Sequence, residues 1–224
     1  MERIDLPETI KPGMRLGRHV VHDPKSWLYP APMAPKIVSV MHKRLVPVFD
    51  QGDLGSCTGN AGAGAMSTEP FTNHFTEDDA KKIYGEATHF DHVKGIYPPD
   101  DTGSSGLAIG KALLKRGLIA GYTHGFSLTA VLKALAIGPA ITGITWLEGC
   151  DDPDGKGIVK YKGRARGGHE ILIDEVDVPR KFLGFTNSWG ADWGLHGRFY
   201  MTWDDYEIAL RNHGDATFFT RKAA

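Results

Sequence analysis

The pattern of apolar and polar positions along the chain changes after Pro139. Before that point, segments compatible with helices alternate with turn residues, and we predict helices over residues 57–68, 77–90, 107–115 and 128–137. Gly117 is expected to end the third helix and Gly138-Pro139 the fourth, because glycine and proline are common just beyond helix C-termini. The part of the chain before Pro139 is therefore predicted to be mostly helical.

After Pro139, apolar runs typical of strands are separated by turns rich in Gly, Pro and Asp. The predicted strands cover residues 140–147, 170–178, 182–187 and 198–203. No internal repeat, low-complexity tract or flexible linker divides the chain, so we expect the helical and the β-rich parts to pack face to face. A cleft between two such parts is a usual place for a binding site.

Two segments depart from this simple pattern. Residues 1–34 are rich in Pro, Arg and His and have no helical period, and we interpret them as an extended N-terminal leader packed on the surface. The predicted helix over residues 57–68 contains many small residues. Glycine lowers helix propensity but allows other elements to approach closely, so this helix is expected to lie buried at the centre of the fold.

Composition narrows the function classes. The chain has 224 residues, of which 41% are hydrophobic, and this is enough for a substantial core. Its formal net charge of -1 argues against nucleic acid or an anionic membrane as an electrostatic partner. We see no apolar run of about 18 residues and no apolar signal region near Met1. The sequence therefore favours a soluble, cytoplasmic protein.

The two cysteines, Cys57 and Cys150, lie far apart in sequence and form no disulfide framework, which suits a reducing compartment. Cys57 follows Gln51 by six residues and opens the predicted helix of small residues. Unpaired N–H groups at a helix N-terminus favour an ionised sulfur and lower the thiol pKa. Cys57 is therefore a candidate nucleophile, whereas Cys150 has no such neighbours and is interpreted as a structural thiol.

Two later motifs supply the groups that a cysteine nucleophile needs. His169 lies in Gly167-Gly168-His169-Glu170, and Asn187 lies in Asn187-Ser188-Trp189-Gly190. A histidine can act as the base for the thiol, and an amide can orient the imidazole. Taken in chain order, Cys57, His169 and Asn187 provide a nucleophile, a base and an orienting group.

These motifs resemble those of the papain-like cysteine peptidases (family C1), and the resemblance extends from about Pro47 to about Tyr200. The family signature around the nucleophile is only partly matched, since Leu54 replaces its first cysteine and Thr58 its aromatic residue. The histidine lies 112 residues beyond Cys57 and the asparagine 130 residues beyond it. The chain is thus similar to a divergent member, of the bacterial or phage type, without the disulfide that braces the nucleophile segment.

The resemblance implies an α+β fold with the active site in the cleft between two lobes. The peptidase domain would cover residues 35–224, with a helical lobe over about 48–125 and a β-rich lobe over about 126–224. The leader is shorter than the helical propeptides of many relatives and is interrupted by prolines, so we do not expect it to control activity. The implied partner is a peptide or protein substrate; the oligomeric state remains open, and no cofactor or metal is expected.

The same resemblance assigns roles to particular residues. The Cys57 thiolate would attack a peptide carbonyl, and the Cys57 N–H and the Gln51 amide would hold the oxyanion. His169 would transfer protons, Asn187 would orient it, and the Trp189 ring would shield their contact from water. The expected substrate-binding residues are Gly55, Ser56, Gly168, Glu170 and Trp189.

Glu170 follows the predicted catalytic histidine, at a position that faces the S2 pocket in papain-like enzymes. An acid there would favour Lys or Arg at the P2 position of the substrate. Alternatively, Glu170 turns away or pairs with a Lys or Arg of the protein itself. The sequence leaves both interpretations open.

Other functions were weighed against this one. Gly55-Ser56-Cys57-Thr58-Gly59 fits the nucleophile elbow of an α/β-hydrolase, but no strand is predicted directly before it. A non-catalytic papain-like module, and acyl transfer to an amine by the same site, stay open. His89 and His92 lack further metal ligands, residues 151–155 lack the spacing of a calcium loop, and Gly110-Lys111 lacks the rest of a phosphate loop.

Overall fold

The computed structural model describes residues 2–222. Its elements are β1 (Glu2–Ile4), β2 (Val20–His22), η1 (Pro24–Leu28), β3 (Val40–Met41), α1 (Cys57–Met66), α2 (Glu77–Ala87), α3 (Gly106–Lys115), β4 (Gly121–Gly125), α4 (Leu128–Ala134), β5 (Ala140–Leu147), η2 (Glu148–Cys150), β6 (Ala165–Asp177), β7 (Phe182–Thr186), β8 (Arg198–Thr202), α5 (Trp203–Arg211) and β9 (Asp215–Thr220). The fold contains both α-helices and β-strands, and its strands are antiparallel, as the predicted α+β class requires.

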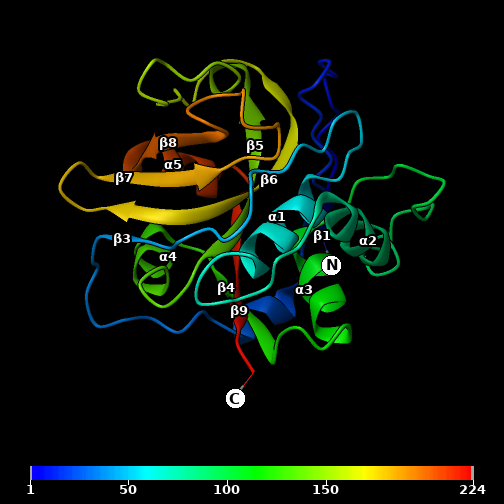
Figure 1. Cartoon of the computed structure of the whole chain (residues 1–224), viewed down its shortest axis with the longest axis horizontal. Helices are drawn as coiled ribbons and strands as arrows, with labels where there is room; N and C mark the ends of the chain where they lie inside the picture. The colour runs from blue at the N-terminus through cyan, green and yellow to red at the C-terminus, as the bar shows by residue number, and fades with distance from the viewer. Residues whose placement is uncertain (1, 223–224) are drawn as a thin grey trace.

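The main sheet is antiparallel throughout and has the strand order β4-β9-β5-β6-β7-β8, with β3 paired beside β6. Its central strands β5 and β6 are almost completely buried. Figure 1 shows helices α1, α2 and α3 gathered on one side of this sheet. The sheet is thus the common wall of two hydrophobic cores.

The two cores lie on opposite faces of the sheet because successive strand residues point to opposite faces. On β5, Ile144 belongs to the core shared with α4 and α5, whereas Ile141 belongs to the core shared with α1, α2 and α3. On β6, Ile171 and Leu172 divide in the same way. This alternation also decides to which side the polar residues of β5 and β6 project.

Helix α1 is buried along its whole length, which confirms the prediction of a central helix of small residues. Its glycines allow the close packing: a Cβ on Gly59 would lie 2.5 Å from the carbonyl oxygen of Ala80 in α2. On its other side α1 packs against β6. The N-terminus of α1 is therefore held at the boundary between the helices and the sheet.

The predicted helices and strands all exist, but several of their ends differ. Helices α1, α2 and α4 end two or three residues before the predicted limits, and β6 begins at Ala165 instead of residue 170. The predicted strand over 198–203 ends at Thr202 because the Thr202 hydroxyl accepts a hydrogen bond from the Asp205 N–H and caps α5. The short strands β1, β2 and β3, and also β4, α5 and β9, were not predicted from the sequence.

The expectation of a surface leader is wrong for residues 16–21, which enter the protein, whereas most of the other described residues of the leader are exposed or half-buried. Leu16 and Val20 are fully buried and Arg18 is 3% exposed. The segment enters the protein because its backbone finds hydrogen-bond partners inside, among them the carbonyl oxygen of Gly168 on β6. Buried backbone groups need such partners, and a composition rich in Pro and Arg does not reveal them.

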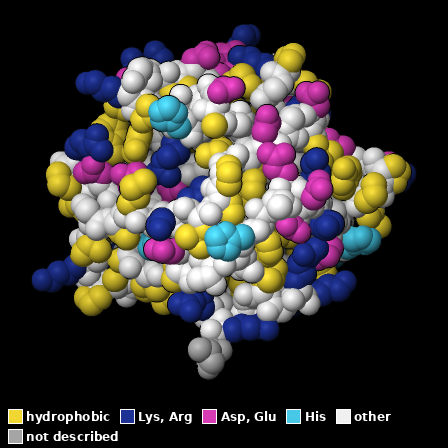
Figure 2. Space-filling model, in the orientation of Figure 1, with side chains coloured by type: hydrophobic (Ala, Val, Ile, Leu, Met, Phe, Trp, Pro, Cys, Tyr) yellow, Lys and Arg dark blue, Asp and Glu magenta, His cyan; other side chains and the backbone are white. Residues whose placement is uncertain are grey.

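The surface agrees with the near-zero net charge. On the face that Figure 2 shows, Lys and Arg side chains are intermingled with Asp and Glu side chains. Within residues 2–222, the structure contains no helix that is both long and apolar enough to cross a membrane.

Candidate active site

Cys57 is the first residue of α1, as the sequence predicts, and it is fully buried. Ser56 precedes it, and the Ser56 side chain makes no capping hydrogen bond to the helix. Instead, the Asn60 amide donates to the Ser56 Oγ and to its carbonyl oxygen. Burial raises the pKa of the Cys57 thiol, and the backbone N–H of Glu170 offsets part of this, so the sulfur lies near the backbone of β6 at the residue after His169.

His169 is oriented by Asn187. Its Nε2 lies 2.8 Å from the Asn187 Oδ1. The Ser188 N–H also donates to this oxygen at 2.8 Å, so the amide presents its oxygen to the imidazole. The two residues meet because β6 and β7 pair, with Leu172 opposite Thr186. Among residues 2–222, the Nδ1 of His169 has no hydrogen-bond partner, and this nitrogen is free to exchange a proton with a reacting group.

Aromatic rings enclose the imidazole. The Trp189 ring stacks on His169 with centroids 4.8 Å apart, and the Trp146 ring meets it edge-on at 4.9 Å. Trp189 is 5% exposed and Trp146 is fully buried. The position of Trp189 suits the predicted shielding of the His169–Asn187 contact, whereas Trp146, on β5, carried no sequence motif that could have identified it.

Gln51 lies beside the nucleophile segment and is also held in place. Its Nε2 donates to the Leu54 carbonyl oxygen at 2.8 Å and lies 3.5 Å from that of Leu16. Its Oε1 accepts from the Ser188 hydroxyl at 2.6 Å. This role of Ser188 was not predicted, although its place directly after Asn187 could have suggested it.

Burial controls the charge states of the Cys57 thiol and the His169 imidazole. Loss of water raises the pKa of the Cys57 thiol, and it lowers the pKa of His169 to about 4, partly against the Asn187 hydrogen bond. The closed cleft therefore favours a neutral thiol and a neutral imidazole. The thiolate–imidazolium pair stays a prediction for a cleft that is open to water.

The leader closes the cleft through residues 15–19, which we call the strap. The N–H groups of Gly17 and Arg18 donate to the Gly168 carbonyl oxygen at 3.2 and 3.0 Å. The Ser104 N–H donates to the Gly17 carbonyl oxygen at 2.8 Å, and the Trp189 Nε1 donates to that of Arg15 at 2.9 Å. Two of the predicted substrate-binding residues, Gly168 and Trp189, are thus occupied by the chain itself.

The strap also covers the segment before the nucleophile. Gly17 adopts a φ of +137°, and a Cβ on it would lie 2.1 Å from the Gly55 carbonyl oxygen. Only glycine can pass there without displacing backbone atoms. Gly55, a third predicted substrate-binding residue, therefore touches the strap, whereas Ser56 turns its side chain toward Asn60.

Glu170 is fully buried and faces Arg18 of the strap, with 3.6 Å between its Oε2 and the Arg18 Nε. The Arg18 Nη2 also lies 2.9 Å from the Asp215 Oδ2. Burial and the nearby Asp215 raise the pKa of Glu170 well above its usual range, and Arg18 offsets part of this. Asp215 was missed because its place beside Glu170 depends on strand order, which the sequence does not reveal.

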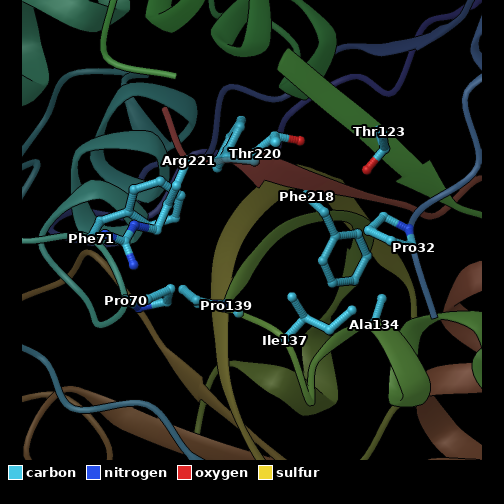
Figure 3. A pocket seen from close by; sticks show the side chains of 12 residues that line it. Pro32, Pro70, Phe71, Thr123, Ala134, Ile137, Pro139, Phe218, Thr220 and Arg221 are labelled. Atoms are coloured by element: carbon cyan, nitrogen blue, oxygen red, sulfur yellow. The ribbon is translucent and has the colours of Figure 1, made fainter. Parts of the chain in front are cut away.

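The remaining features lie away from Cys57. An apolar pocket of about 310 Å³ contains Phe71, Ile137 and Phe218 among its lining residues (Figure 3), and neither Cys57 nor His169 lines it. Cys150 is buried, and its burial raises its pKa to about 12, so it stays a thiol. Among residues 2–222, no group of three or more His, Cys, Asp and Glu side chains is placed to hold a metal ion.

Solved structures with the same architecture are cysteine proteases. Xylellain, a cysteine protease from Xylella fastidiosa, is 17% identical, with a TM-score of 0.65 over 100% of this chain and 99% of its own. Bromelain protease from Ananas comosus, in complex with the E64 inhibitor, is 15% identical, with a TM-score of 0.54 over 79% and 94%. The Amb a 11 cysteine protease of ragweed pollen, in its proform, is 17% identical, with a TM-score of 0.59 over 96% and 66%.

No protein-family model and no curated protein sequence matches the chain. At these identities the structural likeness establishes the fold and not the activity. The predicted fold class is confirmed: the chain has the papain-like fold, with a helical part packed on an antiparallel sheet.

Proposed function

We propose that the protein is a cysteine peptidase with Cys57 as nucleophile, His169 as acid and base, and Asn187 as orienting residue. The observation that carries the proposal is the arrangement of His169. Its Nε2 is held by Asn187, its Nδ1 has no partner within residues 2–222, and the next residue is Glu170, whose backbone N–H offsets part of the effect of burial on the pKa of the Cys57 thiol. These contacts support a free imidazole nitrogen that faces the Cys57 sulfur at the N-terminus of α1.

The chemistry follows from these groups. With the cleft open to water, the Cys57 thiol transfers its proton to the His169 Nδ1, and the thiolate attacks a peptide carbonyl carbon. The Cys57 N–H and the Gln51 amide donate to the oxyanion. His169 then returns the proton to the leaving amine as the C–N bond breaks. Water, deprotonated by His169, hydrolyses the thioester and regenerates the thiol.

Peptides or proteins are the proposed substrates, and the reaction needs no cofactor. The bromelain relative binds the inhibitor E64 in its solved structure, which supports a peptide-binding cleft. Glu170 lies buried and faces the guanidinium of Arg18, so in this structure it pairs with an arginine of the protein itself, which is the alternative that the sequence left open. A basic residue at P2 would take the place of Arg18 when the strap leaves the cleft. We further propose that the protein is soluble and acts in a reducing compartment, because its cysteines are both free.

A positional peptide library tests the proposal. Cleavage is measured by mass spectrometry with the wild type and with Cys57→Ala, and Cys150→Ala serves as the matched control. The assay also includes Gly17→Ala, because a Cβ at Gly17 would collide with Gly55 and open the cleft. Cleavage is expected with Gly17→Ala and Cys150→Ala and is expected to fall by at least about 10³-fold with Cys57→Ala.

Peptides with Arg at P2 should be cleaved faster than those with Leu. The absence of any Cys57-dependent cleavage in all variants would leave a non-catalytic papain-like module as the function. An amide product formed when an amine is added would instead identify acyl transfer by the same thioester.

A further inference from the structure

The buried pocket of Arg18 is built from three neighbouring strands. In the sheet, Gly143 on β5 pairs with Glu170 on β6 and with Asp215 on β9. Residues directly opposite in a sheet project from the same face, so the two acids flank the glycine on one face. That face is the one covered by α1, α2 and α3, and the Arg18 side chain lies across it.

Gly143 makes room for the guanidinium group. A Cβ on Gly143 would lie 1.8 Å from the Arg18 Nε and 2.5 Å from its Cδ. The Arg18 side chain therefore fills the volume that a side chain at position 143 would take. An acid, a glycine and an acid in one row form a flat slot with negative charge at both ends, which matches a planar cation with several N–H donors.

Arg18 fills this slot but leaves several of its polar groups without hydrogen bonds. Its Nη2 donates to the Asp215 Oδ2 and to the His213 carbonyl oxygen, both at 2.9 Å. Within residues 2–222, however, its Nε and Nη1 and both carboxylate oxygens of Glu170 make no hydrogen bond. Buried polar groups without partners cost free energy, so an arginine that reached Glu170 more closely would bind better than Arg18 does.

The strap is tethered on both sides of the cleft. Before it, the Thr9 N–H donates to the Arg166 carbonyl oxygen at 2.6 Å, and the Arg166 Nη2 donates back to the Thr9 carbonyl oxygen at 2.9 Å. After it, the Ala31 N–H donates to the His124 carbonyl oxygen at 2.9 Å. The strap can therefore leave the cleft while the leader stays attached, and it remains at a high effective concentration.

We propose that the strap is a reversible competitor built into the cleft, and that the slot between Glu170 and Asp215 is a guanidinium site at which an arginine side chain of a peptide displaces Arg18. Control of peptide hydrolysis by this exchange rests on the proposed peptidase function. Occupation of the slot and exposure of Cys57 do not, and they can be measured separately.

Alkylation of Cys57 by iodoacetamide reports whether the cleft is open. The rate is followed by peptide mass spectrometry, with the buried Cys150 as internal reference. The variants are Gly17→Ala, whose Cβ would meet Gly55, and Arg18→Ala, which removes the cation. The control is Arg3→Ala, which removes an exposed leader arginine whose one ion pair within residues 2–222 is with Asp5. Thermal unfolding checks that each variant is folded.

Cys57 should react at least about tenfold faster in both cleft variants than in the wild type and in Arg3→Ala, because the rate is set by the fraction of molecules with an open cleft. Equal rates in all four proteins would overturn the competitor role. The intact mass should stay that of the full chain, and loss of the leader on opening would overturn reversibility.

A ligand tests the guanidinium site without any substitution at Arg18. Acetyl-arginine amide should accelerate Cys57 alkylation in the wild type, whereas acetyl-citrulline amide, which has the same shape without the charge, should not. In Gly143→Ala the slot is filled, so alkylation should be fast and insensitive to both compounds. Equal effects of the two compounds on the wild type would overturn the site.

The two proposals fail in different ways. If Gly17→Ala exposes Cys57 and yet cleaves no peptide, the strap is a competitor and the peptidase proposal falls. If the wild type cleaves peptides as fast as Gly17→Ala does, the peptidase proposal holds and the strap does not restrain it.

Discussion

Single residues at the cleft set its charge balance. Glu170 and Asp215 bring two carboxyl groups to one face of the sheet, and Arg18 brings the cation. Moving charges out of water is costly, so such a pocket favours any occupant that supplies a positive charge or a proton. The same burial keeps Cys57 and His169 neutral. The closed cleft therefore favours the neutral forms of both groups and also covers them.

The buried imidazole makes stability depend on pH. The pKa of His169 is about 4 in the folded chain, against about 6.5 for an unfolded chain. Its contribution is therefore present above about pH 6.5 and is lost as the pH falls toward 4, by about 3 kcal/mol in total. Urea unfolding of the wild type at pH 7 and pH 4.5 should show this loss, and His169→Gln should remove most of it.

Two controls isolate the contribution of His169. His74→Gln changes an exposed histidine and should leave the pH dependence as it is. Glu170 acts in the opposite direction, because its pKa is raised in the folded chain. Its contribution to stability is present at a pH below its pKa in the unfolded chain and is lost as the pH rises. The comparison of wild type with His169→Gln cancels this term. The same pH dependence in both proteins would contradict the buried neutral imidazole.

Residues of the candidate site could be predicted where a chemically suitable residue type stands in a recognisable local motif. Cys57 opens a helix and His169 and Asn187 lie in glycine-rich motifs, so residue type and spacing were sufficient. Arg18 and Asp215 were not predictable. Arg18 and Asp215 come together only because the strands have the order β9-β5-β6 and because the residue of β5 opposite Asp215 is a glycine. The sequence around Arg18 and Asp215 indicates neither of these features.

At the scale of elements, the helices and strands with a long apolar pattern were predicted, and short or cap-dependent ones were not. The strand β5 has the predicted bounds because its apolar run is continuous. Strand β4 contains only five residues, two of them glycine, and is stabilised by pairing with β9. Helix α5 depends on the Thr202 cap. Tertiary pairing and capping override local propensity in such cases.

Helix α2 supports the wall of the cleft through Tyr84. Its hydroxyl donates to the Asp101 Oδ1 at 2.7 Å and accepts from the Gly103 N–H at 2.9 Å. Tyr84→Phe leaves that N–H without its acceptor and should lower the free energy of unfolding by about 1–3 kcal/mol, measured by urea unfolding. Tyr97→Phe is the matched control, because the Tyr97 ring packs at a tilt against Tyr84 with centroids 5.1 Å apart, but its hydroxyl makes no hydrogen bond within residues 2–222.

The control should change stability by less than about 0.5 kcal/mol. A loss in Tyr84→Phe no larger than that in Tyr97→Phe would mean that the loop of residues 101–103 is held by other contacts. A larger loss would confirm that α2 positions this loop, and with it the backbone that pairs with the strap at Ser104.

On the scale of the whole molecule, the leader joins parts that are distant in sequence. Its composition suggested a surface segment, yet it crosses between the helices and the sheet and carries a buried arginine. Sequence patterns describe side chains, whereas residues 17–19 of the leader are positioned by backbone hydrogen bonds to Gly168 and Ser104. Any segment with free backbone groups can make such bonds, so its own sequence could not predict where it lies.

A buried ion cluster around Asp151 connects the leader to the sheet. Its carboxylate accepts from the Arg166 Nη1 at 2.7 Å and from the Trp146 Nε1 at 2.8 Å, and it pairs with Lys11 of the leader. The Arg166 Nη2 in turn donates to the carbonyl oxygens of Thr9 and Met14. The leader is thus attached to β6 through one guanidinium whose charge Asp151 balances.

Asp151→Asn should therefore destabilise the whole fold and loosen the leader together. It leaves the Arg166 guanidinium buried without its counter-ion, for which we expect a loss of about 3–5 kcal/mol in the free energy of unfolding. Lys11→Ala removes the partner that stays 44% exposed and should cost no more than about 1 kcal/mol. Urea unfolding measures both losses, and amide hydrogen exchange should show faster exchange at residues 9–18 only in Asp151→Asn. Equal losses in the two variants would mean that the leader is held by its surface contacts and not through the buried guanidinium.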